Sequence, residues 1–102
     1  MKTYNKLVRD KIPQMIENEN RHPVTRILET EEYKQELNKK LQEEVAEYIE
    51  DNNVEELADI VEVVYGILDS MNVSIEEFEK VRNAKVQKRG AFKERIYLES
   101  AD

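Results

Sequence analysis

The sequence has no cysteine, and it contains only two glycines and two prolines among 102 residues. Without cysteine the chain cannot form disulfides or bind a metal through thiolates, and nothing in its composition points to an oxidising compartment. The scarcity of turn residues argues against a sheet protein. No apolar run is long enough to span a bilayer, and the segment MKTYNKLVRD lacks the apolar core of a signal peptide. We therefore expect a cytoplasmic protein with no membrane partner.

Hydrophobic residues make up 39% of the chain and charged residues 38%, a balance that is typical of long amphipathic helices. We expect a single all-α domain, residues 1–102, that forms an antiparallel helical bundle. A chain of this length buries only about 60–65% of the surface that it exposes when unfolded. The bundle is therefore expected to be completed by oligomerisation.

Charge is divided along the chain. The net charge is −7, which argues against general nucleic-acid binding. Residues 29–79 contain seventeen acids and three lysines, a net charge of −14, while the two flanks together carry +7. An acidic centre attracts cations and basic flanks attract anions, and a metal–polyphosphate complex presents both.

Apolar periodicity and end signals predict four helices, over residues 11–18, 30–51, 54–71 and 75–89. Asp10 is the expected N-terminal cap of the first, which carries Pro13 in its first turn. Asn53 and Ser74 are the expected caps of the last two, each followed three residues later by a glutamate. Gly90 is the expected C-terminal cap of the last helix. The third helix has the widest apolar face and is expected to be the most buried.

Helical projection at about 100° per residue separates two groups of acids. Glu43 and Glu50 fall on the side of their helix away from the apolar stripe, as solvated acids should. Two i, i+3 pairs instead fall within the apolar faces or at their margins: Glu44, Glu47, Glu56 and Asp59. These faces must pack together, so the four carboxylates are expected to lie near one another.

Burying uncompensated carboxylates costs several kcal/mol or more. Lys39 and Lys40 are the only nearby cations, too few for four acids. A hard divalent cation supplies the missing charge, and oxygen-only ligands suit Mg²⁺ or Mn²⁺. A di-iron centre of the ferritin type needs Glu-x-x-His pairs, whereas the single histidine, His22, lies in an expected surface loop.

Purely structural interpretations of these acids also exist. Glu56 can serve as a helix cap, and Glu44 can pack its stem at the stripe edge while its carboxylate stays in water. Acid pairs can also stabilise helices electrostatically. For any one acid such an interpretation is favoured, whereas the occurrence of all four in two matching i, i+3 pairs favours a metal site.

Three segments resemble the MazG-like, all-α nucleotide pyrophosphohydrolases. EEVAE at 43–47 followed by ELAD at 56–59 is similar to the EExxE…ExxD signature of that family. YNKLVRDKIP at 4–13 and KRGAF at 88–92 resemble the beginning and the C-terminal KRGxF of a small subgroup. The segments occur in the same order as in the family, and the resemblance covers nearly the whole chain.

The resemblance implies a homodimer or homotetramer that cleaves a nucleoside triphosphate to monophosphate and pyrophosphate in a house-cleaning role. It implies Mg²⁺ ligands at Glu44, Glu47, Glu56 and Asp59. Glu43, Glu44 and Glu47 are the implied catalytic acids, with Glu43 supporting or orienting water. From the basic flanks, the candidates for holding the triphosphate are Lys6, Arg9, Lys11, Lys85, Lys88 and Arg89.

Two alternative functions stay open at the level of sequence. A phosphoribosyl-ATP pyrophosphohydrolase of histidine synthesis has similar catalytic acids. A helical oligomerisation module that binds nucleotide without cleaving it would have the same composition. Substrate turnover distinguishes all three functions.

Overall fold

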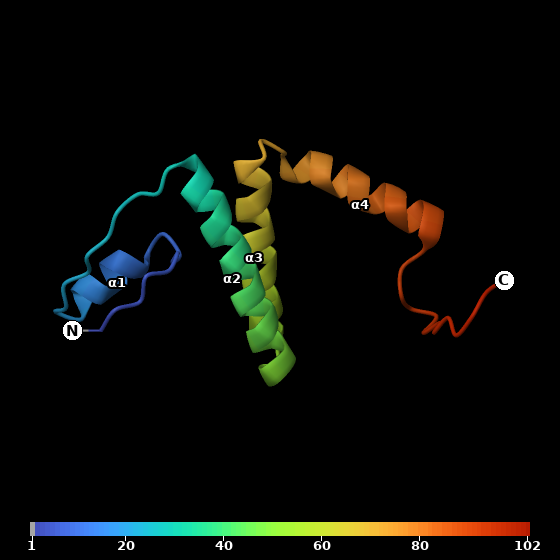
Figure 1. Ribbon diagram of the computed structural model, residues 1–102, viewed down its shortest axis with the longest axis horizontal. Helices are drawn as coiled ribbons and strands as arrows, with labels where there is room; N and C mark the ends of the chain where they lie inside the picture. Colours follow the sequence, from blue (N-terminus) through green and yellow to red (C-terminus); the bar gives the residue numbers. More distant parts are fainter. Residues whose placement is uncertain (1) are drawn as a thin grey trace.

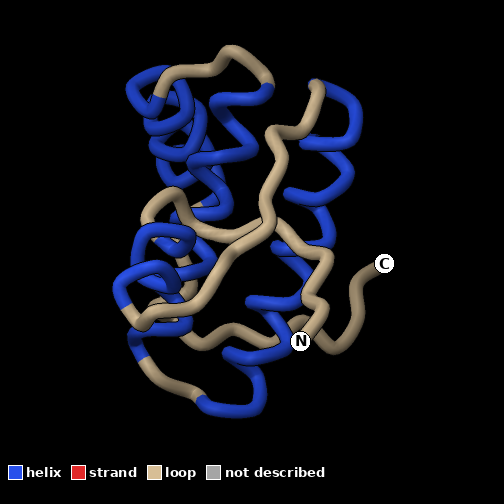
Figure 2. The backbone as a smooth tube through the Cα atoms, turned by 90° about the vertical axis from the view of Figure 1, so that its left-hand side faces the viewer, coloured by secondary structure: helices blue, strands red, loops and turns tan. Residues whose placement is uncertain are grey.

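The computed structural model describes residues 2–102, and in this part of the chain every regular element is a helix. The helices are α1 (Ile12–Asn18), α2 (Thr30–Asp51), α3 (Val54–Ser70) and α4 (Ile75–Arg89). Figure 1 shows α2 and α3 side by side, with α1 and α4 projecting to opposite sides. Figure 2 shows that loops make up the rest of the described chain. The all-α prediction is therefore confirmed, while Met1, the first residue of the predicted domain, lies outside the described residues.

Local capping explains where the later helices begin and end. The side chain of Asn53 accepts a hydrogen bond from the Glu56 N–H at 3.0 Å, and that of Ser74 accepts one from the Glu77 N–H at 3.1 Å. Between α2 and α3, Asn52 adopts the left-handed conformation at φ 52°, which asparagine tolerates. This two-residue connection turns the chain back, so that α3 runs antiparallel to α2.

The prediction that Asp10 caps the first helix is wrong. The N-terminal cap of α1 is Lys11, whose side chain makes no capping hydrogen bond. The chain already has helical dihedrals at Lys11, because the Ile12 N–H bonds to the Arg9 carbonyl at 3.1 Å and starts a turn there. Asp10 therefore lies one residue too early to accept from the first free N–H groups of the helix.

The core lies between α2 and α3. The buried apolar side chains are Leu37 of α2 and Val63 and Leu68 of α3. Gly66 permits close packing of the two helices, because a Cβ at that position would lie 3.1 Å from Leu37 Cδ2. All three residues belong to α2 and α3, and α4 contributes no buried residue.

The chain is extended for its length. Its radius of gyration is 18.0 Å and its extents are 60 × 31 × 24 Å, whereas a compact domain of this size has a radius of about 13 Å. Only α2 and α3 pack along their lengths, so one copy of the chain does not enclose a bundle. Large apolar side chains remain exposed in the C-terminal tail, including Phe92, Ile96 and Tyr97.

One side of the α2–α3 pair exposes large apolar side chains, and we call this side the apolar face. It consists of Val45, Ile49, Val54, Leu57 and Val61, all more than a third exposed. In helical projection these residues lie on the side of each helix away from Glu47 and Asp59. The expectation that α3 is the most buried helix is confirmed, because α3 has the largest share of buried and half-buried residues of the four helices. No helix in residues 2–102 has the length and apolarity needed to cross a membrane.

Candidate metal centre

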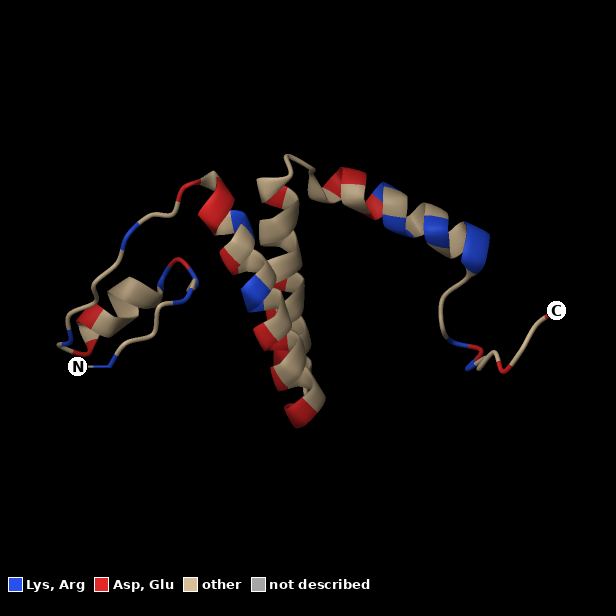
Figure 3. Ribbon diagram, in the orientation of Figure 1, with Lys and Arg blue, Asp and Glu red and all other residues tan. Residues whose placement is uncertain are grey.

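Three carboxylates converge at the end of the α2–α3 pair near the connecting turn. Glu44 of α2 and Glu56 and Asp59 of α3 each place a carboxylate oxygen within 4.8 Å of the others. We call these three residues the acidic cluster. In Figure 3 the two helices carry acidic residues along this region, while α4 begins with acidic residues and becomes basic towards its end. Two helices thus bring together acids that lie up to fifteen positions apart in sequence.

Glu44 is the most buried member of the acidic cluster, because it belongs to the stripe of α2 that faces α3. It is only 6% exposed, and its Oε2 is buried without a hydrogen-bond partner. Burial and the neighbouring charge of Glu47 raise the pKa of Glu44, and a hydrogen bond with Glu47 adds to this rise. An unpartnered carboxylate oxygen in such a place costs free energy unless a cation or proton compensates it.

The backbone and the side chain of Glu56 make different contacts. Its backbone N–H bonds to the Asn53 side chain and so caps α3, while its carboxylate points to the acidic cluster. Glu56 Oε2 is also buried without a hydrogen-bond partner. Burial raises the pKa of Glu56, although a hydrogen bond with Glu47 opposes that rise. Capping alone therefore does not account for the Glu56 side chain.

Glu47 lies at the rim of the acidic cluster. Its side chain is exposed, and it is not one of the three residues whose oxygens converge. It is nevertheless close enough to affect both neighbours, since it raises the pKa of Glu44 and opposes the rise in the pKa of Glu56. Glu47 is thus close enough to complete a ligand set and open enough to contact a bound molecule.

Glu43 is separate from the acidic cluster and is neutralised by lysines. Lys6 Nζ lies 3.1 Å from Glu43 Oε1, and Lys40 Nζ lies 3.5 Å from Oε2. Burial alone would raise the pKa of Glu43, but the hydrogen bond from Lys6 and the charge of Lys40 lower it overall. The prediction that Glu43 is a solvated acid is therefore wrong in part, because its carboxylate is half-buried and paired with two lysines.

Lys40 is the one residue of the site that is absent from the sequence-based set of site residues. Its half-buried ammonium lies 3.5 Å from Glu44 Oε1 as well as from Glu43. The i, i+4 spacing from Lys40 to Glu44 is the local signal that identifies it. Lys39 instead pairs with Glu36 and takes no part in the site.

The N-terminal flank reaches the acidic cluster, because Arg9 Nη2 lies 2.6 Å from Asp59 Oδ1. Lys11, at the start of α1, makes no ion pair with the residues described. The C-terminal candidates occupy the far end of α4, which projects away from the pair (Figure 3): Lys85, Lys88 and Arg89. A single copy of the chain therefore brings Lys6 and Arg9 to the acids but not this second group.

The residues present fit a hard divalent cation. The acidic cluster offers only oxygen ligands, and two of them are buried without partners. Lys40 and Arg9 supply two positive charges against four carboxylates once Glu47 is included. This excess of negative charge, with oxygen-only donors, is the environment that Mg²⁺ or Mn²⁺ favours.

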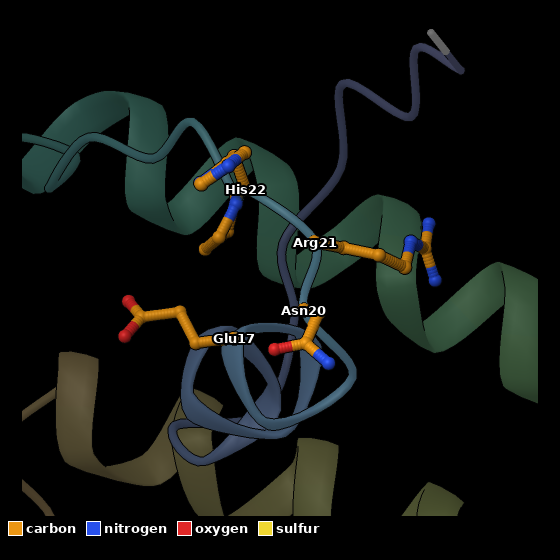
Figure 4. A pocket seen from close by; sticks show the side chains of 5 residues that line it. Glu17, Asn20, Arg21 and His22 are labelled. Carbon is orange, nitrogen blue, oxygen red and sulfur yellow. The ribbon is translucent and has the colours of Figure 1, made fainter.

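A surface hollow lies elsewhere, beside the C-terminal end of α1 (Figure 4). It is lined by Glu17, Asn20, Arg21, His22 and Pro23. The hollow shares no residue with the acidic cluster. His22 is exposed there, in agreement with the prediction of a surface loop.

The chain matches no protein family model, no curated protein and no solved structure.

Proposed function

We propose that this protein is a Mg²⁺-dependent nucleoside triphosphate pyrophosphohydrolase of the MazG-like type. The observation that carries the proposal is the buried, unpartnered carboxylate oxygen of Glu44 within the acidic cluster. The members of this cluster stand at positions that resemble the family's ExxE…ExxD signature. Geometry and sequence resemblance thus support the same residues independently.

Glu44, Glu56 and Asp59 would hold the cation, with Glu47 completing the ligand set from the rim. When bound, Mg²⁺ or Mn²⁺ supplies positive charge for phosphate oxygens and makes water more acidic. Lys40 holds Glu44 in place by its ion pair, so that the buried carboxylate keeps one orientation. The chain therefore provides a fixed oxygen-rich site and needs no thiolate or imidazole ligand.

The remaining residues of the site have distinct tasks. Glu47 is exposed beside two acids, a suitable position for accepting the proton of the attacking water. Lys6 and Arg9 lie at the same edge and can hold phosphate oxygens through charge-assisted hydrogen bonds. Glu43 positions Lys6 and Lys40 between the acids.

The proposed enzyme is a homodimer or homotetramer whose contact surface includes the apolar face. Leu57 and Val61 are 43% and 46% exposed on α3, although they continue a helix that is otherwise rich in apolar residues. A second copy would cover them and add the core that one extended chain lacks. It would also give α4 a surface to pack on, and bring the basic end of α4 near the site of another copy.

A substrate panel tests the proposed reaction. Purified protein with Mg²⁺ is expected to release pyrophosphate and a nucleoside monophosphate from at least one nucleoside triphosphate. Phosphoribosyl-ATP belongs in the panel, because its selective turnover would favour the histidine-pathway alternative. Binding without turnover of any substrate would contradict the proposed activity and favour a nucleotide-binding module. Release of orthophosphate and a diphosphate would contradict cleavage between the α and β phosphates.

A further inference from the structure

Arg9 contacts a member of the acidic cluster across fifty residues of sequence. Its Nη2 lies 2.6 Å from Asp59 Oδ1. In the same segment Lys6 is bonded to Glu43, which lies outside the acidic cluster. Residues 2–10 are therefore attached to the α2–α3 pair by two cations, and only one of them touches a proposed metal ligand.

Glu44 and Asp59, two of the proposed metal ligands, have different environments. Glu44 is buried and has an oxygen with no partner, whereas Asp59 is 38% exposed and its Oδ1 accepts from Arg9. The Arg9 side chain is itself 54% exposed. Ion pairs between groups exposed to this degree contribute little free energy and exchange readily. Arg9 is thus a weakly held cation at one ligand of a strongly negative site.

We propose that Arg9 is an exchangeable counter-ion of the candidate metal centre, in competition with a divalent cation for Asp59. When the cation binds together with a triphosphate, the Arg9 guanidinium leaves Asp59 and binds the phosphate oxygens instead. This inference rests on the proposed function, since it needs both a metal and a polyphosphate at the acidic cluster. Arg9 would therefore weaken the binding of the cation and strengthen the binding of the triphosphate.

Charge and geometry explain why Arg9 would move from Asp59 to the phosphate oxygens. A divalent cation outweighs a single guanidinium charge at carboxylates, and a triphosphate offers several oxygens that match the guanidinium fork. Lys6 remains bonded to Glu43, because Glu43 lies outside the acidic cluster and a cation bound there does not displace Lys6. The segment therefore stays attached while Arg9 exchanges partners.

The test measures Mn²⁺ and nucleotide separately, with Mn²⁺ followed by electron paramagnetic resonance and α,β-methylene-ATP by calorimetry. Without nucleotide, Arg9→Gln is expected to bind Mn²⁺ about two- to fivefold more tightly, because an exposed competing ion pair is lost. With saturating Mn²⁺, the same variant is expected to bind α,β-methylene-ATP about tenfold more weakly. Arg9→Lys keeps the charge, so its Mn²⁺ affinity should stay within about twofold of the original.

The matched control is Arg26→Gln, since Arg26 also forms an exposed pair at 2.6 Å, with Glu32, outside the site. It should change neither affinity. Equal or weaker Mn²⁺ binding by Arg9→Gln, with clear binding by the original protein, would overturn the exchange while leaving the metal centre intact. Absence of Mn²⁺ binding by both proteins would overturn the proposed metal centre and this inference together.

Discussion

The two long faces of the α2–α3 pair differ in how completely the chain satisfies them. On one face, the carboxylates of Glu47, Glu56 and Asp59 lie around the buried Glu44, and the N-terminal segment adds two cations. On the other face, five large apolar side chains are each more than a third exposed. The first face carries more negative charge than its cations neutralise, and the second exposes apolar surface to solvent.

One amphipathic helix pair can therefore present an acidic surface and an apolar surface on different sides. Residues that lie one or two positions apart on α3, such as Asp59 and Leu57, point to different faces because each residue advances the helix by about 100°. A substitution on one face should therefore leave the other unchanged.

The largest expected effect is on assembly. Leu57→Glu places a charge in the apolar face, and burying it at a contact between copies would cost several kcal/mol. We expect the oligomer to dissociate about 100-fold more readily, with a mass that approaches the 12.1 kDa of one chain. Sedimentation equilibrium measures this change.

Val24→Glu is the control for that variant, because Val24 is 91% exposed in a loop outside the apolar face. Its mass should equal that of the original protein. If Leu57→Glu also kept the original mass, the apolar face would not be the contact between copies. Mn²⁺ binding should persist in both variants if the two faces are independent.

A smaller effect is expected on stability. Burial and Glu47 raise the pKa of Glu44, so the folded protein binds more protons than the unfolded chain above the ordinary pKa of 4.5. The free energy of unfolding in EDTA should therefore fall as the pH rises from about 4.5 through the raised pKa of Glu44. Glu44→Gln should remove part of this dependence and stabilise the protein at pH 7 by about 1 kcal/mol.

Urea unfolding at pH 5 and pH 7.5, with EDTA and then with Mg²⁺, checks this prediction. Mg²⁺ should stabilise the original protein more than Glu44→Gln, because only the original has the complete ligand set. Destabilisation by Glu44→Gln in EDTA at pH 7 would mean that Lys40 fully compensates the buried carboxylate.

Local features of the sequence explain how much was predictable. Asn53 and Ser74 cap the helices that follow them, and the bounds of α2 and α4 were predicted closely because caps and periodicity are local signals. The inward position of Glu44 was likewise predicted, since it depends only on the apolar stripe of its own helix. α3 ends at Ser70, one residue before the predicted Met71.

The remaining features depend on distant parts of the chain. The Arg9–Asp59 ion pair joins residues fifty positions apart, and no local pattern specifies it. Glu43 projects outward on its helix, and its ion pair with Lys6 joins residues 37 positions apart. The directions of α1 and α4 were also not predictable, since few contacts fix them within one copy. The error at Asp10 arose because the turn starting at Arg9 moves the cap to Lys11.

The central claim is that the acidic cluster binds a divalent cation, and a Mn²⁺ titration of two neighbouring variants tests it most directly. Glu55 and Glu56 both lie in the first turn of α3, but only Glu56 belongs to the acidic cluster. Glu56→Gln keeps the backbone N–H that Asn53 caps, so the fold should persist. We expect Glu56→Gln to weaken Mn²⁺ binding about tenfold or more, and Glu55→Gln to leave it unchanged. Equal Mn²⁺ affinities for the two variants would contradict the assignment of the site.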